Sequence, residues 1–257
     1  MQYDCEIVVR AATARDMEAR YALVRRSITE YDFDAFVTFF FQELTLQVCV
    51  LCGAVLFIFF GAGLLACALV VPGAAAALAA TVLLGHRALA DSHVQRVRKE
   101  LCGFVAEYRG PLVASPRSLH ARVVLESRTP VHGQHGQHGQ HVQHVQHGQR
   151  VQHVRVVGTI SVSECWGPRR SGWVHALAVD PAWRRRGVGG ALVTACRTYA
   201  LEEGLESLEA VASQLQGAAR GLLHTAGWEM RGSYHRPVLG AALTLPMTQL
   251  GMELPHA

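Results

Sequence analysis

Hydrophobic and polar positions recur with two different periods at the start of this 257-residue chain. Residues 5–10 form a short, mostly apolar run that predicts a β-strand. Over residues 16–29 the apolar side chains recur at helical spacing, which puts Met17, Val24 and Ile28 on one stripe. The chain therefore begins with a strand followed by an amphipathic helix.

A long uncharged segment follows this helix. None of the 42 residues between Glu43 and His86 is charged, which leaves no polar face for a water-exposed helix. Residues 48–71 would form about 36 Å of helix, enough to cross a hydrocarbon core roughly 30 Å thick. The phenylalanines between positions 33 and 41 lie where a bilayer interface is expected. We therefore predict a membrane segment.

The path of this segment follows from its place in the chain. The strand at 5–10 must join the same domain as the later strands, so both ends of the segment have to lie on one side of the membrane. Pro72-Gly73 interrupts the apolar run and predicts the turn. Because residues 73–85 are too few for an untilted span, the segment is either an asymmetric two-span hairpin or a re-entrant wedge. Basic residues on both flanks place that side in the cytosol.

The remainder of the chain alternates between strand and helix patterns. Strands are predicted at residues 102–108, 154–162, 173–179 and 205–212, helices at 189–203 and 216–225, and a last strand at 228–235.

A triplet repeat separates two of these strands. Residues 132–155 read as eight triplets, six of them His-Gly/Val-Gln and the last two RVQ and HVR, and they hold seven of the 14 histidines. A period of three fits neither an α-helix nor a strand, and glycine is not kept in every unit as collagen requires. We interpret the repeat as a surface loop. A weak histidine-rich metal site is the alternative, and a metal-binding membrane protein is the class that it would imply.

Composition adds few constraints. The net charge of +4 is too small to indicate a nucleic-acid partner. The seven scattered cysteines define no disulfide framework and are compatible with a reducing compartment. Charged residues occur throughout the first twenty positions, so we expect no cleaved signal peptide. The oligomeric state is left open.

A glycine-rich basic loop carries the clearest chemical signal. An Asp-Pro turn at 180–181 ends a strand, and an R-x-x-G-x-G pattern then opens a helix. Backbone N–H groups at such a helix start converge on phosphate oxygens, and glycine lets the backbone approach them closely. No Walker or Rossmann pattern is present. The predicted anion-binding residues are Arg184, Arg185, Arg186, Gly187, Val188, Gly189 and Gly190.

This loop resembles motif A of the GNAT acetyltransferases, which cradles the pyrophosphate of acetyl-CoA. Downstream, residues 219–228 (ARGLLHTAGW) are similar to the superfamily's A-x-x-L-Y-x-x-x-G-F segment. The resemblance covers nearly all of the chain outside the apolar segment and the repeat. It implies an α+β fold, a mixed twisted sheet flanked by helices, with acetyl-CoA as co-substrate and no metal.

The apolar insert narrows the resemblance to the camello-like membrane N-acetyltransferases, the group that contains aspartate and cysteine-S-conjugate N-acetyltransferases. Gln216 and the segment from Gly232 to Leu239 also look similar to that group. The domain boundaries that follow are 1–43 for the first strand and helix, 44–85 for the membrane segment, 86–131 for the return to the GNAT domain, 132–155 for the repeat loop and 156–257 for the core.

The resemblance also suggests catalytic positions. His175 stands where many relatives have a glutamate that deprotonates the amine, and an imidazole suits that task. Leu223 stands where many have the tyrosine that protonates the departing thiolate, so that role must be moved, left to water or lost. Nearby candidates for it are His224, Tyr234 and His235. The thioester oxygen is expected to accept from the backbone near Leu177, Ala178 and Val179.

The resulting prediction is a membrane-anchored N-acetyltransferase that acts by direct attack of an amine on acetyl-CoA. The acceptor implied by the resemblance is a small amino acid or its conjugate, and Arg231 and Arg236 are candidates for binding its carboxylate. A protein-lysine acetyltransferase is one alternative. An acetyl-CoA-binding membrane protein with little catalysis is the other. The expected surroundings are membrane lipid, with the endoplasmic reticulum as location and the catalytic domain in the cytosol.

Overall fold

The computed structural model describes residues 5–111, 120–126, 153–165, 170–239 and 243–255. Eight strands in these ranges form one sheet in the order β3-β1-β2-β4-β5-β6-β8-β7. Only the pairs β1–β3 and β5–β6 are parallel, so the sheet is mixed as predicted. The strands are β1 (Cys5–Ala11), β2 (Cys102–Gly110), β3 (Ala121–Leu125), β4 (His153–Cys165), β5 (Ser171–Val179), β6 (Ser207–Ser213), β7 (Glu229–Leu239) and β8 (Leu243–Glu253).

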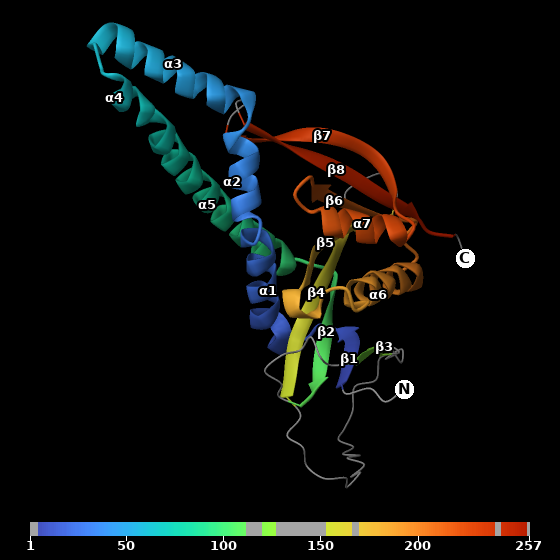
Figure 1. Ribbon diagram of the computed structural model, residues 1–257. Helices are drawn as coiled ribbons and strands as arrows, with labels where there is room; N and C mark the ends of the chain where they lie inside the picture. Colours follow the sequence, from blue (N-terminus) through green and yellow to red (C-terminus); the bar gives the residue numbers. More distant parts are fainter. Residues whose placement is uncertain (1–4, 112–119, 127–152, 166–169, 240–242, 256–257) are drawn as a thin grey trace, which may run out of the picture.

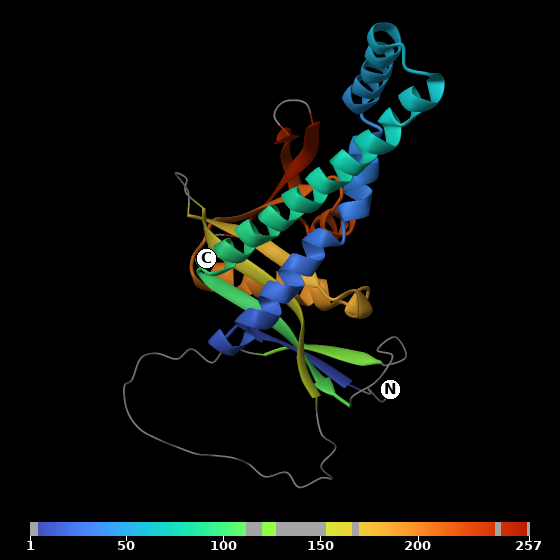
Figure 2. The same cartoon turned by 90° about the vertical axis from the view of Figure 1, so that its left-hand side faces the viewer.

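Helices cover both faces of this sheet (Figures 1 and 2). The base of α5 and the amphipathic α1 lie on one face, while α6 lies on the other, beside α7. The helices are α1 (Met17–Thr29), α2 (Asp32–Phe40), α3 (Glu43–Phe60), α4 (Leu64–Ala68), α5 (Val70–Val97), α6 (Val188–Glu202) and α7 (Gly217–Thr225), with short 3₁₀ turns at Ala14–Asp16 and Pro181–Trp183.

The main core lies between α6 and the central strands. Ile160 and Val162 of β4 and Leu192 of α6 have no exposed surface. Burying one such side chain contributes roughly 1.5–3 kcal/mol. The β-branched run in β4 suits a strand buried on both faces, because branched side chains pack well on a pleated surface.

The apolar segment folds as a helical hairpin that projects away from the sheet (Figure 1). Helix α3 runs outward, ends at Gly61 with φ of 61°, and α5 returns to the sheet. The predicted turn at Pro72-Gly73 is wrong, because both residues lie in the first turn of α5, where a missing N–H costs no hydrogen bond. The chain turns instead at Gly61-Ala62-Gly63.

The aromatic stretch before the hairpin is a helix of its own. Phe39 of α2 is only 2% exposed and packs on Leu78 and Val82 of α5, whereas Phe33 is 73% exposed. The expectation that this whole stretch lies at a bilayer interface is therefore wrong for Phe39. Phe39 packs at the base of the hairpin, where it also contacts the cluster that includes Leu243 of β8.

Two strands lie outside the predicted set. Strand β8 follows β7 and pairs with both β6 and β7, so the strand predicted at 228–235 is not the last. Strand β3 adds a five-residue edge beside β1. The predicted repeat loop falls mostly on residues outside the described ranges, and its final residues, from His153, begin β4.

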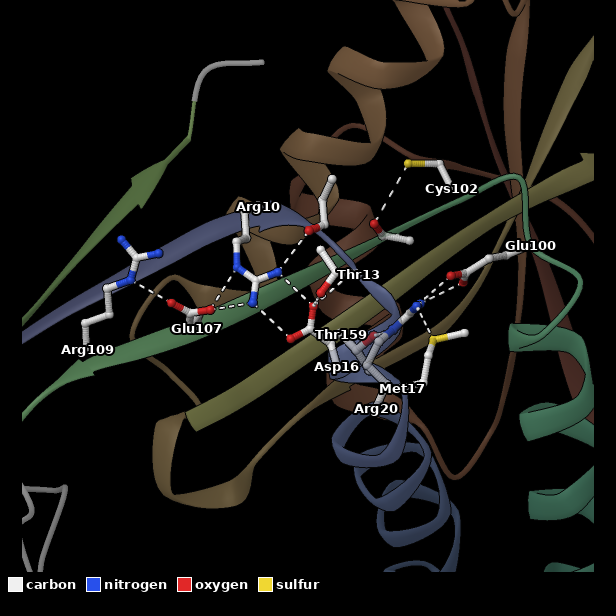
Figure 3. A network of polar contacts seen from close by, with 12 residues as sticks. Arg10, Thr13, Asp16, Met17, Arg20, Glu100, Cys102, Glu107, Arg109 and Thr159 are labelled. Carbon is white, nitrogen blue, oxygen red and sulfur yellow. Dashed lines mark hydrogen bonds and ion pairs between the residues drawn. The ribbon is translucent and has the colours of Figure 1, made fainter. Parts of the chain in front are cut away.

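A buried ionic network joins the N-terminal elements to the sheet (Figure 3). Arg20 of α1 is fully buried, ion-paired with Glu100, and donates to Thr159 Oγ1 at 2.9 Å and Ser161 Oγ at 3.0 Å. Nearby, Arg10 bridges Asp16 and Glu107. These bonds satisfy charges that would otherwise be costly inside the protein, and they fix α1 against β4.

Candidate functional site

The centre of the site is a wedge between two neighbouring strands. Strands β5 and β6 pair only from Ser171 to Val174, although β5 continues to Val179 and β6 to Ser213. Beyond Val174 the backbone of β5 therefore has no ladder partner on that side. Leu177, Ala178 and Val179, the predicted oxyanion segment, lie in this part of β5.

A bulge in β5 accompanies the wedge. Ala178 opposes Thr159 and His175 opposes Ser161, so that two residues of β5, Ala176 and Leu177, face one residue of β4. Ala176 has φ of 53°, a left-handed conformation that costs roughly 1–2 kcal/mol for a residue with a Cβ. Such bulges redirect side chains next to functional sites.

A cavity of about 610 Å³ occupies the wedge. It is lined by β5, β6 and the C-terminal strands, by α1 and α7, and by the base of α5. Its cationic side chains are Arg96 and Arg236, and none of its lining residues is an aspartate or glutamate. The cavity therefore suits a ligand with apolar and anionic parts.

His175 is 8% exposed and lines this cavity. Its Nε2 lies 2.7 Å from Ser163 Oγ, while its buried Nδ1 has no hydrogen-bond partner among the described residues. Burial lowers the pKa of His175 to about 4, and the nearby His93, Arg96 and Arg20 add to this effect. At neutral pH the side chain is a neutral imidazole, the form that can accept a proton.

The predicted phosphate loop forms a tight turn at the start of α6. Asp180 is buried and accepts from Ala182 N at 3.0 Å, which fixes the turn. Arg185 and Gly187 have φ of 61° and 81°. Gly187 is the N-cap of α6 and has no side chain to cap the helix, so this helix start is a candidate anion site.

The three loop arginines have different surroundings. Arg184 donates to Val179 O at 3.0 Å and forms a bidentate ion pair with Glu30 at the end of α1. This pair lowers the pKa of Glu30. Arg186 lies over the Trp183 ring at 5.0 Å, and Arg185 is exposed. Arg184 thus ties the loop to α1, whereas Arg185 extends into solvent.

The second glycine of the loop has a packing role. A Cβ on Gly189 would lie 2.8 Å from Leu222 Cδ2 of α7, whereas one on Gly187 or Gly190 would meet nothing within 4 Å. Gly189 therefore permits close contact between α6 and α7. Gly187 is required by its backbone conformation.

The candidate acids lie in different places. Leu223 is buried and lines the cavity, at the position where the resemblance expects a proton donor. Tyr234 of β7 also lines the cavity and is 46% exposed. His224 and His235 are exposed and are not among the residues that line the cavity. Of the two carboxylate-binding candidates, Arg236 lines the cavity, whereas Arg231 pairs with Glu253 at 2.8 Å.

Cys196 is unsuited to covalent chemistry. It is fully buried in α6, and burial raises the pKa of its thiol well above the usual range. The described part of the chain holds no group of three or more histidine, cysteine, aspartate or glutamate residues that could bind a metal ion. Residues 132–152 of the triplet repeat lie outside that part.

Sequence reasoning missed two contributors to the site. Ser163 carries no motif signal, and only the cross-strand register brings it to His175. Arg20 was placed on a helix but not in the core. Its signal was its spacing from Leu23 and Val24, three and four positions further on, which are apolar and lie on the same face of the helix.

Residues 120–228 match the family model described as Acetyltransferase (GNAT) family. The chain therefore contains a GNAT acetyltransferase family domain, with a GNAT-like α+β fold. No curated protein matches the chain.

Solved acetyltransferase structures are similar to parts of the chain. The ribosomal-protein-S18-alanine N-acetyltransferase from Escherichia coli is 16% identical, with a TM-score of 0.35, over 40% of this chain and 64% of that one. A Bacillus anthracis str. Ames protein described as a streptothricin acetyltransferase, in complex with acetyl coenzyme A, is 17% identical, with a TM-score of 0.36, over 39% of this chain and 57% of that one. An N-acetyltransferase from Staphylococcus aureus Mu50 is 12% identical, with a TM-score of 0.45, over 96% of this chain and 98% of that one. The chain spans less than two thirds of the first two.

Proposed function

We propose that this protein is a membrane-anchored N-acetyltransferase that transfers acetyl from acetyl-CoA to the amine of a small amino acid or amino-acid conjugate. The observation that carries the proposal is the wedge between β5 and β6, which opens beside a glycine-capped helix start. The wedge offers a backbone edge to a thioester, and the helix start offers N–H groups to a diphosphate.

Donor binding in this proposal depends on backbone more than on side chains. Residues 185–190 would surround the diphosphate, with Arg185 and Arg186 adding positive charge. Arg184 would act indirectly, because its guanidinium is bound to Glu30 and holds the loop in place. The backbone of residues 177–179 would donate to the thioester oxygen as negative charge develops on it.

The transfer is a direct displacement. The acceptor nitrogen forms a bond to the acetyl carbonyl carbon, the C–S bond breaks, and CoA leaves as a thiolate. The proton lost by the amine passes to Nδ1 of His175, which is buried in this structure and has to become accessible to the amine before this step. The thiolate takes up a proton from Tyr234 or from solvent, since Leu223 cannot donate one.

The acceptor class follows from the lining of the cavity and from the camello-like resemblance. Arg96 and Arg236 would pair with a carboxylate, and the apolar wall from Phe39, Val82 and Leu245 would contact a hydrophobic substituent. A lysine side chain of a protein would bring its amine without a neighbouring carboxylate, so we rank it second.

Membrane anchoring is supported by the hairpin. The structure has two described helices long and apolar enough to span a bilayer, and only 6% and 11% of their most apolar windows are buried by protein. A core helix would be covered far more. We infer insertion into the endoplasmic reticulum membrane from the cytosolic side, which also supplies acetyl-CoA. Tags at the two termini should both be protease-accessible in intact microsomes; protection of either would contradict this orientation.

One observation favours a second function. Leu223 leaves the usual acid position without a proton donor, as would suit an acetyl-CoA-binding membrane protein with little turnover. A thiol-release assay of detergent-solubilised protein separates the two, using amino acids, cysteine conjugates and lysine peptides as acceptors. We expect release with the carboxylate-bearing acceptors. Tight acetyl-CoA binding without release from any acceptor would support the binding protein instead.

A further inference from the structure

We propose that Ser163 is a positioning residue that holds His175 in the tautomer with the proton on Nε2, leaving Nδ1 as the base. The inference rests on the proposed transferase function and assigns a role within the same site. The observation behind it is geometric: one ring nitrogen is bound to a hydroxyl, and the other is buried with no partner in the part of the chain that the structure describes.

The register of the two strands explains the contact. Ser161 lies directly opposite His175 across the β4–β5 ladder, and Ser163 is two residues further along β4. Successive residues of a strand alternate between faces, so Ser161 and Ser163 share a face with His175. Ser161 is engaged by Arg20 at 3.0 Å, which leaves Ser163 to bind the imidazole.

The two ring nitrogens lie in different surroundings. Ser163 is partly exposed and is not among the residues lining the cavity, so the hydrogen-bond partner of Nε2 lies outside the cavity. His175 itself lines the cavity, and Nδ1 is its remaining nitrogen. A buried polar atom without a partner is costly, and Nδ1 has to become accessible from the cavity before an amine can supply the missing hydrogen bond.

The tautomer decides whether this arrangement works. If Nε2–H donates to Ser163 Oγ, Nδ1 has a lone pair and can accept the amine proton. If the Ser163 hydroxyl donates instead, Nδ1 carries the hydrogen and is useless as a base. The cavity contains other titratable and charged groups near His175, namely His93 and Arg96 from α5, while Arg20 from α1 is buried close by. These neighbours disfavour the positively charged imidazolium that forms when Nδ1 takes up a proton. Ser163 Oγ opposes this effect, because it accepts the hydrogen bond from Nε2–H of the charged ring.

The catalytic test uses variants of the full chain in detergent. Ser163→Ala should lower kcat about tenfold and leave acetyl-CoA affinity within twofold, because one hydrogen bond that orients the ring is lost. Ser163→Thr keeps a hydroxyl and should restore kcat to within threefold. Ser171→Ala is the matched control, since Ser171 also bonds across strands, to Ser207 at 2.8 Å, but does not touch His175. It should keep wild-type kcat within twofold.

A double-mutant cycle shows whether Ser163 acts through His175. In a His175→Ala background, Ser163→Ala should have no further effect on kcat. An equal loss in both backgrounds would mean a merely structural role and would overturn the inference. A normal kcat for Ser163→Ala beside a large loss for His175→Ala would overturn it as well.

The tautomer can be measured without turnover. In protein with ¹⁵N-labelled histidine, the His175 ring signals are identified by their loss in His175→Gln, and they should report Nε2 protonated and Nδ1 bare. Ser163→Ala should reduce that tautomer. A proton on Nδ1 in the wild type would refute the positioning role, even if the protein proved active. Absence of thiol release with the expected tautomer present would instead refute the transferase function and leave Ser163 as the group that orients the ring.

Discussion

Helices α3 and α6 are both apolar, yet only α6 is covered by protein. Seven of the 15 residues of α6 are buried, whereas none of the 18 residues of α3 is. Phe59 and Phe60 at the end of α3 are 77% and 74% exposed. The difference teaches that apolar composition alone does not tell where a helix lies. The helix that packs on the sheet has a polar face, and the helix that projects has none beyond Gln47.

The largest expected effect separates these two helices. Leu192→Asp puts a carboxylate at a fully buried position of α6 and should destabilise the domain by about 4 kcal/mol or more, a large share of a typical 5–15 kcal/mol. Ile58→Asp at an exposed position of α3 should leave thermal unfolding in detergent unchanged and reduce the membrane-bound fraction. Equal destabilisation by both would contradict the contrast between the helices.

The second prediction compares two histidines that line the same cavity. His175 belongs to the sheet, and His86 of α5 is paired with Asp32 at the base of the hairpin. His175→Ala should lower turnover by about 10²- to 10⁴-fold with acetyl-CoA affinity little changed, because a general base is removed. His86→Ala should reduce turnover by less than about tenfold. Steady-state kinetics and donor titration measure both, and a smaller loss for His175→Ala than for His86→Ala would reverse the assignment.

The third prediction is acid sensitivity of the sheet domain. The pKa of His175 is about 4 in the folded protein, against about 6.5 in an unfolded chain. Above pH 6.5 the group is neutral in both states, and below it the unfolded chain binds the proton first. Stability is therefore lost as the pH falls from about 6.5 toward 4, by up to about 3 kcal/mol. His175→Gln should show a smaller acid loss in denaturant titrations; an identical loss would assign the acid sensitivity to other groups.

The fourth prediction uses two glycines in the same backbone conformation. Gly187 begins α6 and Gly61 ends α3, with φ of 81° and 61°, and a Cβ at either would meet nothing within 4 Å. Valine at each should cost a similar backbone strain. Only Gly187→Val should weaken acetyl-CoA binding, by at least about tenfold or 1.4 kcal/mol. Unchanged affinity in a folded Gly187→Val protein would refute the phosphate-loop assignment.

The smallest effect is expected for deletion of residues 132–152. These lie between β3 and β4 in sequence, and a connection between strands tolerates a change of length at small entropic cost. Acetyl-CoA affinity should stay within about twofold of the wild type. Loss of folding would show that the repeat packs on the domain.

Much of the sheet domain was predictable because its elements have local signatures. The β-branched residues of β4 indicate a strand, and the Asp-Pro pair before residues 184–190 indicates a turn, each from the local sequence alone. Strand β8 was missed because Pro246 lies inside it, and a proline within a run argues against a strand. Pro246 lies opposite His235 of β7 and one residue beyond Met247, where the pairing of β8 with β6 ends, so on that side it removes no ladder hydrogen bond.

The features that could not be predicted depend on contacts between distant segments. The hairpin turn was placed at Pro72, yet a proline in the first turn of a helix is allowed, and Gly61 alone gives little signal against a continuous span. The contact between Ser163 and His175 can be predicted only when the cross-strand register is known. The burial of Arg20 depends on its ion pair with Glu100, which is 80 residues away in the sequence. Local patterns contain neither.

Helix α5 joins both regions as one stiff rod. Its 28 residues, about 42 Å long, run from the projecting end of the hairpin back to the sheet (Figure 2). Its residues His86, His93 and Arg96 line the cavity. A rod of that length tilted by about five degrees about one end moves the other by about 4 Å. A bilayer sets the tilt of an inserted helix through its thickness. With the hairpin inserted in a membrane, as proposed above, we expect the width of the cavity to depend on lipid composition, and the range of acceptors to differ between a thin and a thick membrane.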